Sequence, residues 1–566
     1  MKRVYFLAGI LLAGIVVFSG CKKKEKDMNK ELQEFITQYE GKVIPLFKEA
    51  SLASWNAEIT GKEEDFNKAA ELGIKINTIF TNKEDFKKLK EFKESGKVTD
   101  SLLLRQLDDL YNSYLSSQAD PKKLEEIIRE ESKVSQKYNT YRAKIGNKEY
   151  SDNEIEDILK NSTNSDSLKA AWEASKQIGA LVAADVIKLA KLRNEIAKSI
   201  GFSNYHEMSL KLGDQDPQEI NKIFDELDSL TKDAFATLKG EMDDYFAKRY
   251  GIKKEELRPW HYQNRFFQEA PKIYSVNFDT YYANQNLETL TAKYFNGIGL
   301  PVEAIMKASD LYEKEGKSQH AFCTHIDGQG DVRILCNIKP NEYWMNTMLH
   351  EFGHGVYDKY LDFNLPYSLR NAAHTFTTEA IAMMFGRMAT NGQWLKDNVG
   401  IKEEEKQKIA EIGFKSLQLQ QLTFSRWSQV MYRFEKGMYE NPDQDLNKLW
   451  WDLVEKYQML KRPEGRNSAD WASKNHIATS PCYYHNYLLG ELLASQLHNY
   501  IVTNIIKSDD FLNQSYSNNK EVGAYLKTKV FEPGSKYQWN TMIEKATGEK
   551  LTAKYYAKQF VSSLKK

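Results

Sequence analysis

Two histidines and a glutamate stand close together in the segment Leu349–His354, which reads LHEFGH. His350 and His354 are four residues apart, so on an α-helix their imidazoles lie on one face and can bind one metal ion. Glu351 is offset by one residue and is placed to accept a proton from a water molecule that the metal polarises. The pattern predicts zinc-dependent hydrolysis at a carbonyl group; two surface histidines on an amphipathic helix are the alternative.

A third metal ligand is predicted in the next helical run, residues 375–385, which reads TFTTEAIAMMF. Glu379 is the one carboxylate in this uncharged stretch, and a lone buried glutamate is costly unless it binds a metal or a partner. Catalytic zinc sites of this kind use two histidines and one carboxylate and leave a fourth position for water. We therefore predict that His350, His354 and Glu379 bind one Zn²⁺; a glutamate that interacts with the helix dipole is the alternative.

The composition restricts the class of protein that presents these residues. The 566 residues include 79 Lys plus Arg and 79 Asp plus Glu, and neither a basic excess nor a basic stripe is visible, which argues against nucleic-acid binding. A mean hydropathy of −0.62 excludes a polytopic membrane protein. With 41% hydrophobic residues and only 12 prolines and 30 glycines, the chain is expected to fold into long helices around a sizeable core.

The elements that position the motif are predicted to be mainly helical. Helical periodicity extends from about residue 29 to residue 316 without a strand pattern, and includes a helix over residues 168–200 that ends at Gly201. Residues 320–337 contain two β-prone stretches around Asp327–Gly330 and predict a β-hairpin. Cys323 and Cys336 lie about equally far from this turn, which fits either a disulfide or two buried thiols.

The N-terminus has the pattern of a bacterial lipoprotein signal peptide over residues 1–20. Lys2 and Arg3 precede the apolar run Val4–Phe18, and two small residues precede Cys21. We expect cleavage before Cys21, lipidation of Cys21, a polar tether over residues 21–30 and one domain over residues 31–566, since no linker-like stretch divides it. The domain would then work outside the cytoplasm, anchored to a membrane; an ordinary secretion signal is the alternative.

Several separated blocks resemble the angiotensin-converting-enzyme family of zinc peptidyl-dipeptidases. HEFGH is followed by LPYSLR and then by EAI, and further blocks lie on both sides: Ala53–Asn56, His320-Ala321, Lys474–Ile477 and Tyr484–Tyr487. The likeness extends from about residue 30 to the C-terminus. It implies two helical lobes that flank a deep channel, with a small β-hairpin beside the active site. It also implies a monomer that binds one zinc ion and releases dipeptides from the C-termini of oligopeptides.

The resemblance also implies residue roles. Glu351 would act as general base and acid, and Tyr487 would stabilise the oxyanion of the tetrahedral intermediate. His476 and His320 would donate hydrogen bonds to substrate carbonyls. Ala321 would belong to the strand that holds the substrate backbone as an added edge strand.

A clamp for the C-terminal carboxylate of the substrate is implied as well. Lys474 and Tyr484 would form it, with Tyr483 as a rival to Tyr484 and Gln263 as a further candidate. A clamp at this place fixes the chain end two residues beyond the zinc ion, which would explain the release of dipeptides. A solvated surface charge is the alternative for Lys474.

Two departures from the family pattern bear on the prediction. Met383 stands where the family often has an aspartate, so the partner that orients the zinc-binding histidines is not assigned. His485 or Asn486 replaces an arginine associated with chloride activation, which argues against chloride dependence. Two other functions are kept: a zinc oligopeptidase that cuts internally in short peptides, and a non-catalytic lipoprotein that binds peptides on a peptidase scaffold.

Overall fold

The computed structural model describes residues 27–274 and 276–562; the predicted signal peptide and the predicted lipidation site Cys21 lie outside the described residues. In this part of the chain the fold is mainly helical, with two small antiparallel sheets of two strands each. One large hydrophobic core extends from Ala119 to Val561. The prediction of a mainly α, single-domain protein is confirmed. Across the described residues, no helix combines the length and the apolar character that crossing a bilayer requires.

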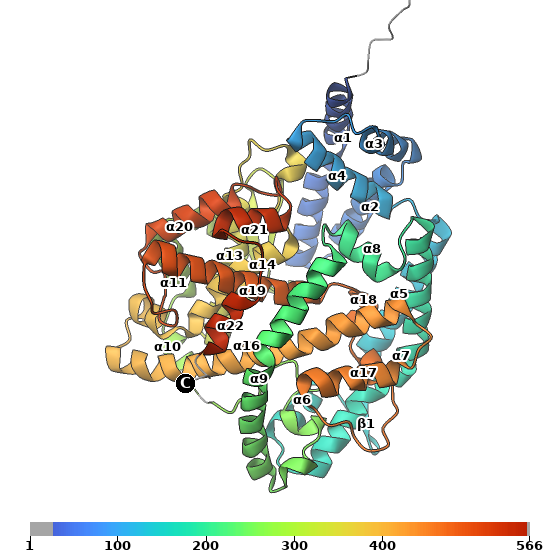
Figure 1. Ribbon diagram of the computed structural model, residues 1–566. Coiled ribbons are helices and arrows are strands. Elements are labelled where there is room, and N and C mark those ends of the chain that lie inside the picture. The colour runs from blue at the N-terminus through green and yellow to red at the C-terminus, as the bar shows by residue number, and fades with distance from the viewer. Residues whose placement is uncertain (1–26, 275, 563–566) are drawn as a thin grey trace, which may run out of the picture.

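The first four helices form a group at the top of Figure 1. They are α1 (Met28–Thr60), α2 (Glu63–Phe80), α3 (Lys83–Ser95) and α4 (Ser101–Ser116). This group has a small core of its own, to which Leu32, Leu89 and Leu107 belong. The helix α1 begins at Met28, where the side chain of Asp27 accepts a hydrogen bond from the backbone N–H of Lys30, so residues 28–30 of the predicted tether are helical.

The remaining helices lie in two halves, with the long helix α16 running across both in Figure 1. The first half includes α5 (Pro121–Thr140), α6 (Asp152–Asn161), α7 (Ser165–Ser199), α8 (Tyr205–Leu212), α9 (Pro217–Tyr250), α17 (Leu446–Leu453) and α18 (His476–Thr479). The second half includes α10 (Asp279–Tyr282), α11 (Leu287–Gly297), α13 (Glu342–Lys359), α14 (Thr375–Gly386), α19 (His485–Tyr500), α20 (Lys520–Leu526), α21 (Trp539–Thr547) and α22 (Lys554–Phe560). Two short helices, α12 (Glu303–Ala308) and α15 (Gly392–Trp394), contact the strand at residues 332–335 and the helix α16, respectively. The helix α16 covers Glu403–Glu440.

The helix predicted over residues 168–200 is α7, which begins at Ser165 and ends at Ser199. Asn164 caps its N-terminus by accepting a hydrogen bond from the N–H of Ser167. After its last turn Gly201 adopts a φ of 99°, a conformation that glycine reaches without strain, so the chain turns away at the predicted place.

Strands occur in two hairpins. In the predicted hairpin, β3 (Phe322–His325) pairs with β4 (Val332–Leu335), and the register places Cys323 opposite Ile334. A second hairpin, β1 (Ala143–Ile145) with β2 (Lys148–Tyr150), corrects the expectation that residues 29–316 contain no strands. Its strands are three residues long, and its turn at Gly146 has a φ of 60°. Such short strands are too brief to produce an alternating hydrophobic pattern.

The cysteines near the β3–β4 hairpin are free thiols. Because Ile334 lies opposite Cys323, Cys336 is displaced diagonally from it, and both thiols remain unpaired. Of the two alternatives predicted for Cys323 and Cys336, the structure supports free thiols and not a disulfide.

Candidate active site

The helix α13 carries the HExxH residues through the centre of the second half. Asn341 caps it by accepting a hydrogen bond from the N–H of Trp344, and Met345, Met348 and Phe352 bury one side of the helix in the core. The side chains of His350 and His354 retain 27% and 16% exposure, respectively, and their ring centroids are 5.0 Å apart. The predicted four-residue spacing therefore presents both imidazoles to the same accessible space.

The helix α14 brings Glu379 to the two histidines. The helices α13 and α14 approach each other closely at Gly353, where a Cβ atom would lie 2.8 Å from the Cα of Ala382. Glu379 Oε2 lies 3.8 Å from the Nε2 atom of His350 and 3.8 Å from that of His354. These separations are too long for hydrogen bonds, so the three groups face a common point without bonding one another.

The three side chains fit a zinc ion. One ligand atom from each residue lies within 4.8 Å of the others, and two ligands about 2.0–2.1 Å from a tetrahedral zinc are themselves roughly 3.3 Å apart. Burial lowers the pKa of His350 to about 4 and, together with His350, that of His354 to about 3. Both imidazoles are therefore neutral at pH 7, which is the form that binds metals. Burial raises the pKa of Glu379, and no cation among the described residues counteracts this rise.

The partner that orients one of the two predicted metal-binding histidines is Thr378, which the sequence did not assign. Nδ1 of His354 lies 2.7 Å from Oγ1 of Thr378, so the other ring nitrogen, Nε2, is left to face Glu379. Thr378 directly precedes Glu379 in the chain, and this adjacency is the feature of the sequence that could have identified it as a partner of His354. Met383, which stands in place of an aspartate, instead approaches Gly490 of α19, where a Cβ would lie 3.4 Å from its sulfur.

Glu351 lies beside the strand β3. Its side chain is buried, and burial together with the charge of Glu379 raises its pKa to about 8, while a hydrogen bond from the backbone N–H of Cys323 acts in the opposite direction. The carboxyl group thus lies in a poorly solvated place where protonated and ionised forms are close in free energy near pH 7–8. Such a group is suited to proton transfer.

The helix α19 and the two residues before it add tyrosines to the site. The helix packs on α14 at Gly490, where a Cβ would lie 3.3 Å from the Cβ of Glu379. Tyr487 is close enough to Glu379 for that charge to contribute to its raised pKa, after burial and Tyr483. The ring of Tyr487 lies 5.4 Å from the ring of Tyr483 and 5.4 Å from that of Tyr484.

Lys474 is a buried cation on the other side of these tyrosines. Its Nζ donates a 2.7 Å hydrogen bond to Oε1 of Gln268 and lies 5.4 Å from the ring centroid of Tyr484. The rings of Phe266 and Trp427 lie 5.3 Å and 5.5 Å from the same nitrogen. Burial, reinforced by Arg265, lowers its pKa to about 8. The contact with the Lys474 ammonium group distinguishes Tyr484 from its rival Tyr483.

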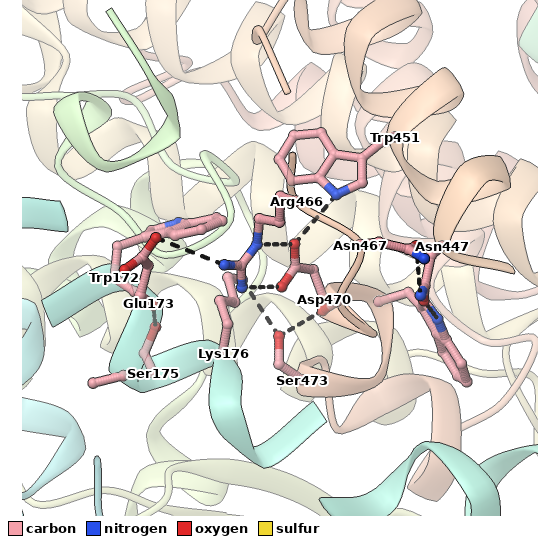
Figure 2. Close-up of polar contacts among 12 residues, drawn as sticks. Trp172, Glu173, Ser175, Lys176, Asn447, Trp451, Arg466, Asn467, Asp470 and Ser473 are labelled. Carbon is pink, nitrogen blue, oxygen red and sulfur yellow. Dashed lines mark hydrogen bonds and ion pairs between the residues drawn. The ribbon is translucent and has the colours of Figure 1, made fainter. Parts of the chain in front are cut away.

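A polar network holds the turn that precedes Lys474 (Figure 2). Both carboxylate oxygens of the buried Asp470 accept hydrogen bonds from Arg466, at 2.6 Å and 2.7 Å, and one of them also accepts from Trp451 Nε1 at 3.2 Å. Lys176 of α7 donates to Ser473 Oγ at 3.3 Å. At Gly179 a Cβ would lie 2.1 Å from the carbonyl oxygen of Ala469, so α7 lies directly against this turn. Side chains from α7, α17 and the loop therefore fix the backbone that carries Lys474.

Comparison with known proteins decides the family. The family model described as angiotensin-converting enzyme, peptidase family M2, matches residues 26–264 and 270–564, which is most of the chain. The chain belongs to this family. The family implies a zinc ion, for which His350, His354 and Glu379 form a suitable group.

A curated relative gives a more distant match. Oligopeptidase PepF of Bacillus subtilis (strain 168) is 28% identical over 154 residues, which is 26% of this chain and 22% of that protein. The matched region thus spans about a fifth of the relative. The names of this relative and of the angiotensin-converting enzyme family both describe peptidases. Neither match shows where in a peptide a cut would be made.

The break in the family match at residues 265–269 coincides with a departure in the carboxylate clamp. Gln263 was the candidate amide, but its Nε2 donates to the carbonyl of Lys160 at 3.0 Å. The amide that bonds Lys474 belongs to Gln268, inside the unmatched stretch. The family model leaves residues 265–269 unmatched, so the family comparison does not cover the glutamine that bonds Lys474.

The remaining predicted substrate-binding and catalytic residues, His476, Ala321 and His320, differ in their contacts with the rest of the site. The ring of His476 lies 5.3 Å from that of Tyr484, and burial with the charge of Lys474 lowers its pKa to about 4. Ala321 is half-buried directly before β3, and His320 is exposed at the approach to this strand without a hydrogen bond to any described residue.

The two positions that stand in place of the family's arginine, His485 and Asn486, are occupied by hydrogen bonds to another side chain. Nε2 of His485 lies 2.7 Å from Gln215 Oε1, and Asn486 Oδ1 accepts a 2.8 Å hydrogen bond from Gln215 Nε2. Both side chains are buried and paired with one glutamine. Neither supplies the positive charge that a chloride ion requires.

Proposed function

We propose that this protein is a zinc-dependent peptidyl-dipeptidase that releases dipeptides from the C-termini of oligopeptides. The observation that carries the proposal is Lys474, a buried ammonium group held by Gln268 and Tyr484 and linked through Tyr484 and Tyr487 to the metal-binding group. A zinc ion bound by His350, His354 and Glu379 would polarise the attacking water and the scissile carbonyl. The remaining chemistry belongs to the side chains around it.

Glu351 is assigned the proton transfers. As a carboxylate it accepts a proton from the attacking water, and as a carboxylic acid it returns that proton to the nitrogen of the leaving dipeptide. Its poorly solvated position, which raises its pKa to about 8, makes both forms accessible near neutral pH. The hydrogen bond from the Cys323 N–H orients the carboxyl group during both steps.

Tyr487 and His476 are assigned the stabilisation of developing negative charge. Burial raises the pKa of Tyr487, so its hydroxyl keeps its proton, and burial lowers the pKa of His476 to about 4, so its imidazole is a neutral donor. A neutral donor aimed at an oxyanion in a poorly solvated site contributes about 3 kcal/mol to catalysis. His320 and Ala321 are assigned the substrate backbone beside β3.

Lys474, Tyr484 and Gln268 are assigned the terminal carboxylate. A carboxylate at Lys474 would form an ion pair with the buried ammonium group, whose hydrogen-bond partner Gln268 and surrounding aromatic rings are uncharged. The charge of Glu269 acts on Lys474 but makes no ion pair with it. Binding the chain end at this distance from the metal-binding group sets the number of residues between the end and the cut. The distance between Lys474 and the metal-binding group would then determine the length of the product.

The second function to be tested is an oligopeptidase that cuts internally. It is favoured by the match to oligopeptidase PepF and by a cavity of about 400 Å³ that Lys474 lines. Its lining includes Lys160, Arg265 and Glu269, and it offers room for a chain that extends beyond the clamp. A substrate that passes Lys474 would be cut without regard to its terminus.

The deciding experiment is mass spectrometry of the products of one peptide, offered with a free and with an amidated C-terminus to the zinc-loaded protein. A peptidyl-dipeptidase releases dipeptides in succession from the free form and cuts the amidated form poorly. Equal cleavage of both forms at internal bonds would favour the oligopeptidase. Zinc-bound protein that leaves both peptides intact would favour the non-catalytic peptide-binding function.

We also propose that Cys21 is lipidated and holds the enzyme at a membrane outside the cytoplasm. The support is the order of Lys2, Arg3, the apolar run and Ser19-Gly20 before the cysteine. Replacement of Cys21 by serine should move the protein from the membrane fraction to the soluble fraction. Unchanged membrane association of Cys21→Ser would contradict the anchor.

A further inference from the structure

The helix α13 exposes one further polar residue on the face that carries the zinc-binding histidines. From His350 to Asp358, the partly exposed residues are His350, His354 and Asp358, and all residues between them are buried. The spacing of four places the three on one face, here called the exposed face of α13. The Cα of Asp358 lies about 6 Å beyond that of His354 along the helix axis, given a rise of about 1.5 Å per residue.

Asp358 has no partner of its own. No hydrogen bond or ion pair joins its carboxylate to any residue in the described ranges, and burial is the cause of a pKa raised to about 7. By contrast, the buried Asp470 binds Arg466 and Trp451. A poorly solvated carboxylate without a cation is unfavourable, and a ligand that brings a positive charge to it would relieve that cost.

The strand β3 runs beside the exposed face of α13. The backbone N–H of Cys323 bonds Glu351, and burial, followed by the charges of Asp358 and Glu351, raises the pKa of the Cys323 thiol. Among the described strands β3 pairs with β4 alone, so no strand lies along its second edge, where an extended peptide could add. A peptide on this edge would pass from Glu351 to Asp358.

Asp358 and the clamp lie in different parts of the molecule. Lys474 directly precedes α18 and contacts Gln268 and Tyr484, whereas Asp358 belongs to α13 and neighbours Cys323. Figure 1 places α13 and α18 in opposite halves. With the substrate C-terminus at Lys474, the residues that precede the cut bond are the ones that reach Asp358.

We infer that Asp358 is a specificity-determining residue that binds a positively charged group of the substrate on the N-terminal side of the cut bond. This inference rests on the proposed peptidyl-dipeptidase function for the direction of the chain. The cation is either the side chain of a lysine or arginine, or the α-ammonium group of a short peptide that ends there. Both sources present the same chemistry to the carboxylate.

Paired peptides test the inference and separate the two sources. In the first arm, lysine replaces norleucine at each of the three residues before the cut bond of an otherwise neutral, N-acetylated peptide. In the second arm, free and N-acetylated peptides are shortened one residue at a time. We expect kcat/KM of the wild-type enzyme to be about tenfold or more higher for the charged member of a pair at one position, because a charge-assisted contact forms in a poorly solvated place.

The variants give the control. In Asp358→Asn the ratio within that pair should fall to about threefold or less, whereas Asp358→Glu should retain the preference, since it keeps the charge. Asp443→Asn removes an equal charge from an exposed surface position, 73% accessible, and should leave the ratio as in the wild type. The same pair is titrated into Glu351→Gln protein, with and without Asp358→Asn, so that the dissociation constants give a readout independent of turnover.

Two results overturn the inference: a wild-type ratio within threefold at every position in both arms, or a preference that survives in Asp358→Asn. The position of the bond that is cut tests the proposed peptidyl-dipeptidase function and not the role of Asp358. Products from an internal bond would reject dipeptide release, while the ratio between charged and neutral peptides would still be measured at that bond.

Discussion

The metal-binding group and the carboxylate clamp are built in different ways. His350, His354 and Glu379 come from two consecutive helices within 30 positions of one another, and they meet because α13 and α14 pack directly at Gly353. The clamp joins Gln268, Lys474 and Tyr484, which span more than 200 positions. Its backbone is held by α7, by α17 and by the Arg466–Asp470 pair.

This difference separates reaction chemistry from substrate choice. Two packed helices with a regular spacing provide a rigid metal site, and changes there should affect turnover with every peptide. The clamp depends on long-range polar contacts, and changes there should affect only peptides with a free C-terminus. Variants in the two regions should therefore have effects that differ in kind as well as in size.

The largest effect is expected for Glu351→Gln in the metal region. Loss of the proton-transferring group should lower kcat by about 10²–10⁴-fold while zinc content by metal analysis stays at one per chain. Glu342→Gln, in the first turn of the same helix, is the matched control and should keep both activity and zinc. Unchanged turnover in Glu351→Gln would remove this residue from its assigned role.

The next largest effect is expected for Lys474→Ala in the clamp. Removing one partner of a buried charge pair should lower kcat/KM for free-carboxylate peptides by about 30-fold or more, equivalent to about 2 kcal/mol. The same variant should change kcat/KM for amidated peptides by much less. Lys160→Ala, which lines the same cavity but is about half exposed, is the control. Equal losses with both kinds of peptide would contradict the clamp and the distinction drawn between the regions.

A smaller effect is expected for Thr378→Val, which keeps the side-chain shape but removes the contact to His354 Nδ1. Loss of a group that orients a metal ligand should weaken zinc binding by about tenfold, measured by competition with a chelator. Thr347→Val on the exposed part of α13, where the hydroxyl bonds only the Tyr343 carbonyl, serves as control. An unaltered zinc affinity would show that His354 is oriented by packing alone.

The smallest effect is expected for pH. Because burial lowers the pKa of Lys474 to about 8, its ammonium group loses its proton as the pH rises through that value. Between pH 7.0 and 8.5, kcat/KM for free-carboxylate peptides should decrease by about fourfold relative to amidated peptides, since kcat/KM reports groups of the free enzyme. Lys474→Arg keeps its charge in this range and should abolish the relative decrease. A ratio that stays constant with pH in the wild-type enzyme would contradict this assignment.

Prediction from sequence worked where the signal was local. The helix around His350, the helix with Glu379 and the β3–β4 hairpin all follow from spacing within about 20 residues. It failed for β1–β2, whose strands are too short for a pattern, and it did not identify Gln268, which bonds Lys474 from within the stretch 265–269 that the family model leaves unmatched.

What the amino-acid sequence determined by itself is the set of groups for metal binding and proton transfer, because the helical repeat alone places His350, Glu351 and His354 in fixed relation. What only the tertiary structure decided is which residues serve those groups. Thr378 beside His354, Gln268 beside Lys474 and the unpaired carboxylate of Asp358 on the exposed face of α13 depend on how distant helices pack. Packing of this kind leaves no periodic trace in a single chain, since each contact joins positions whose separation is set by the fold.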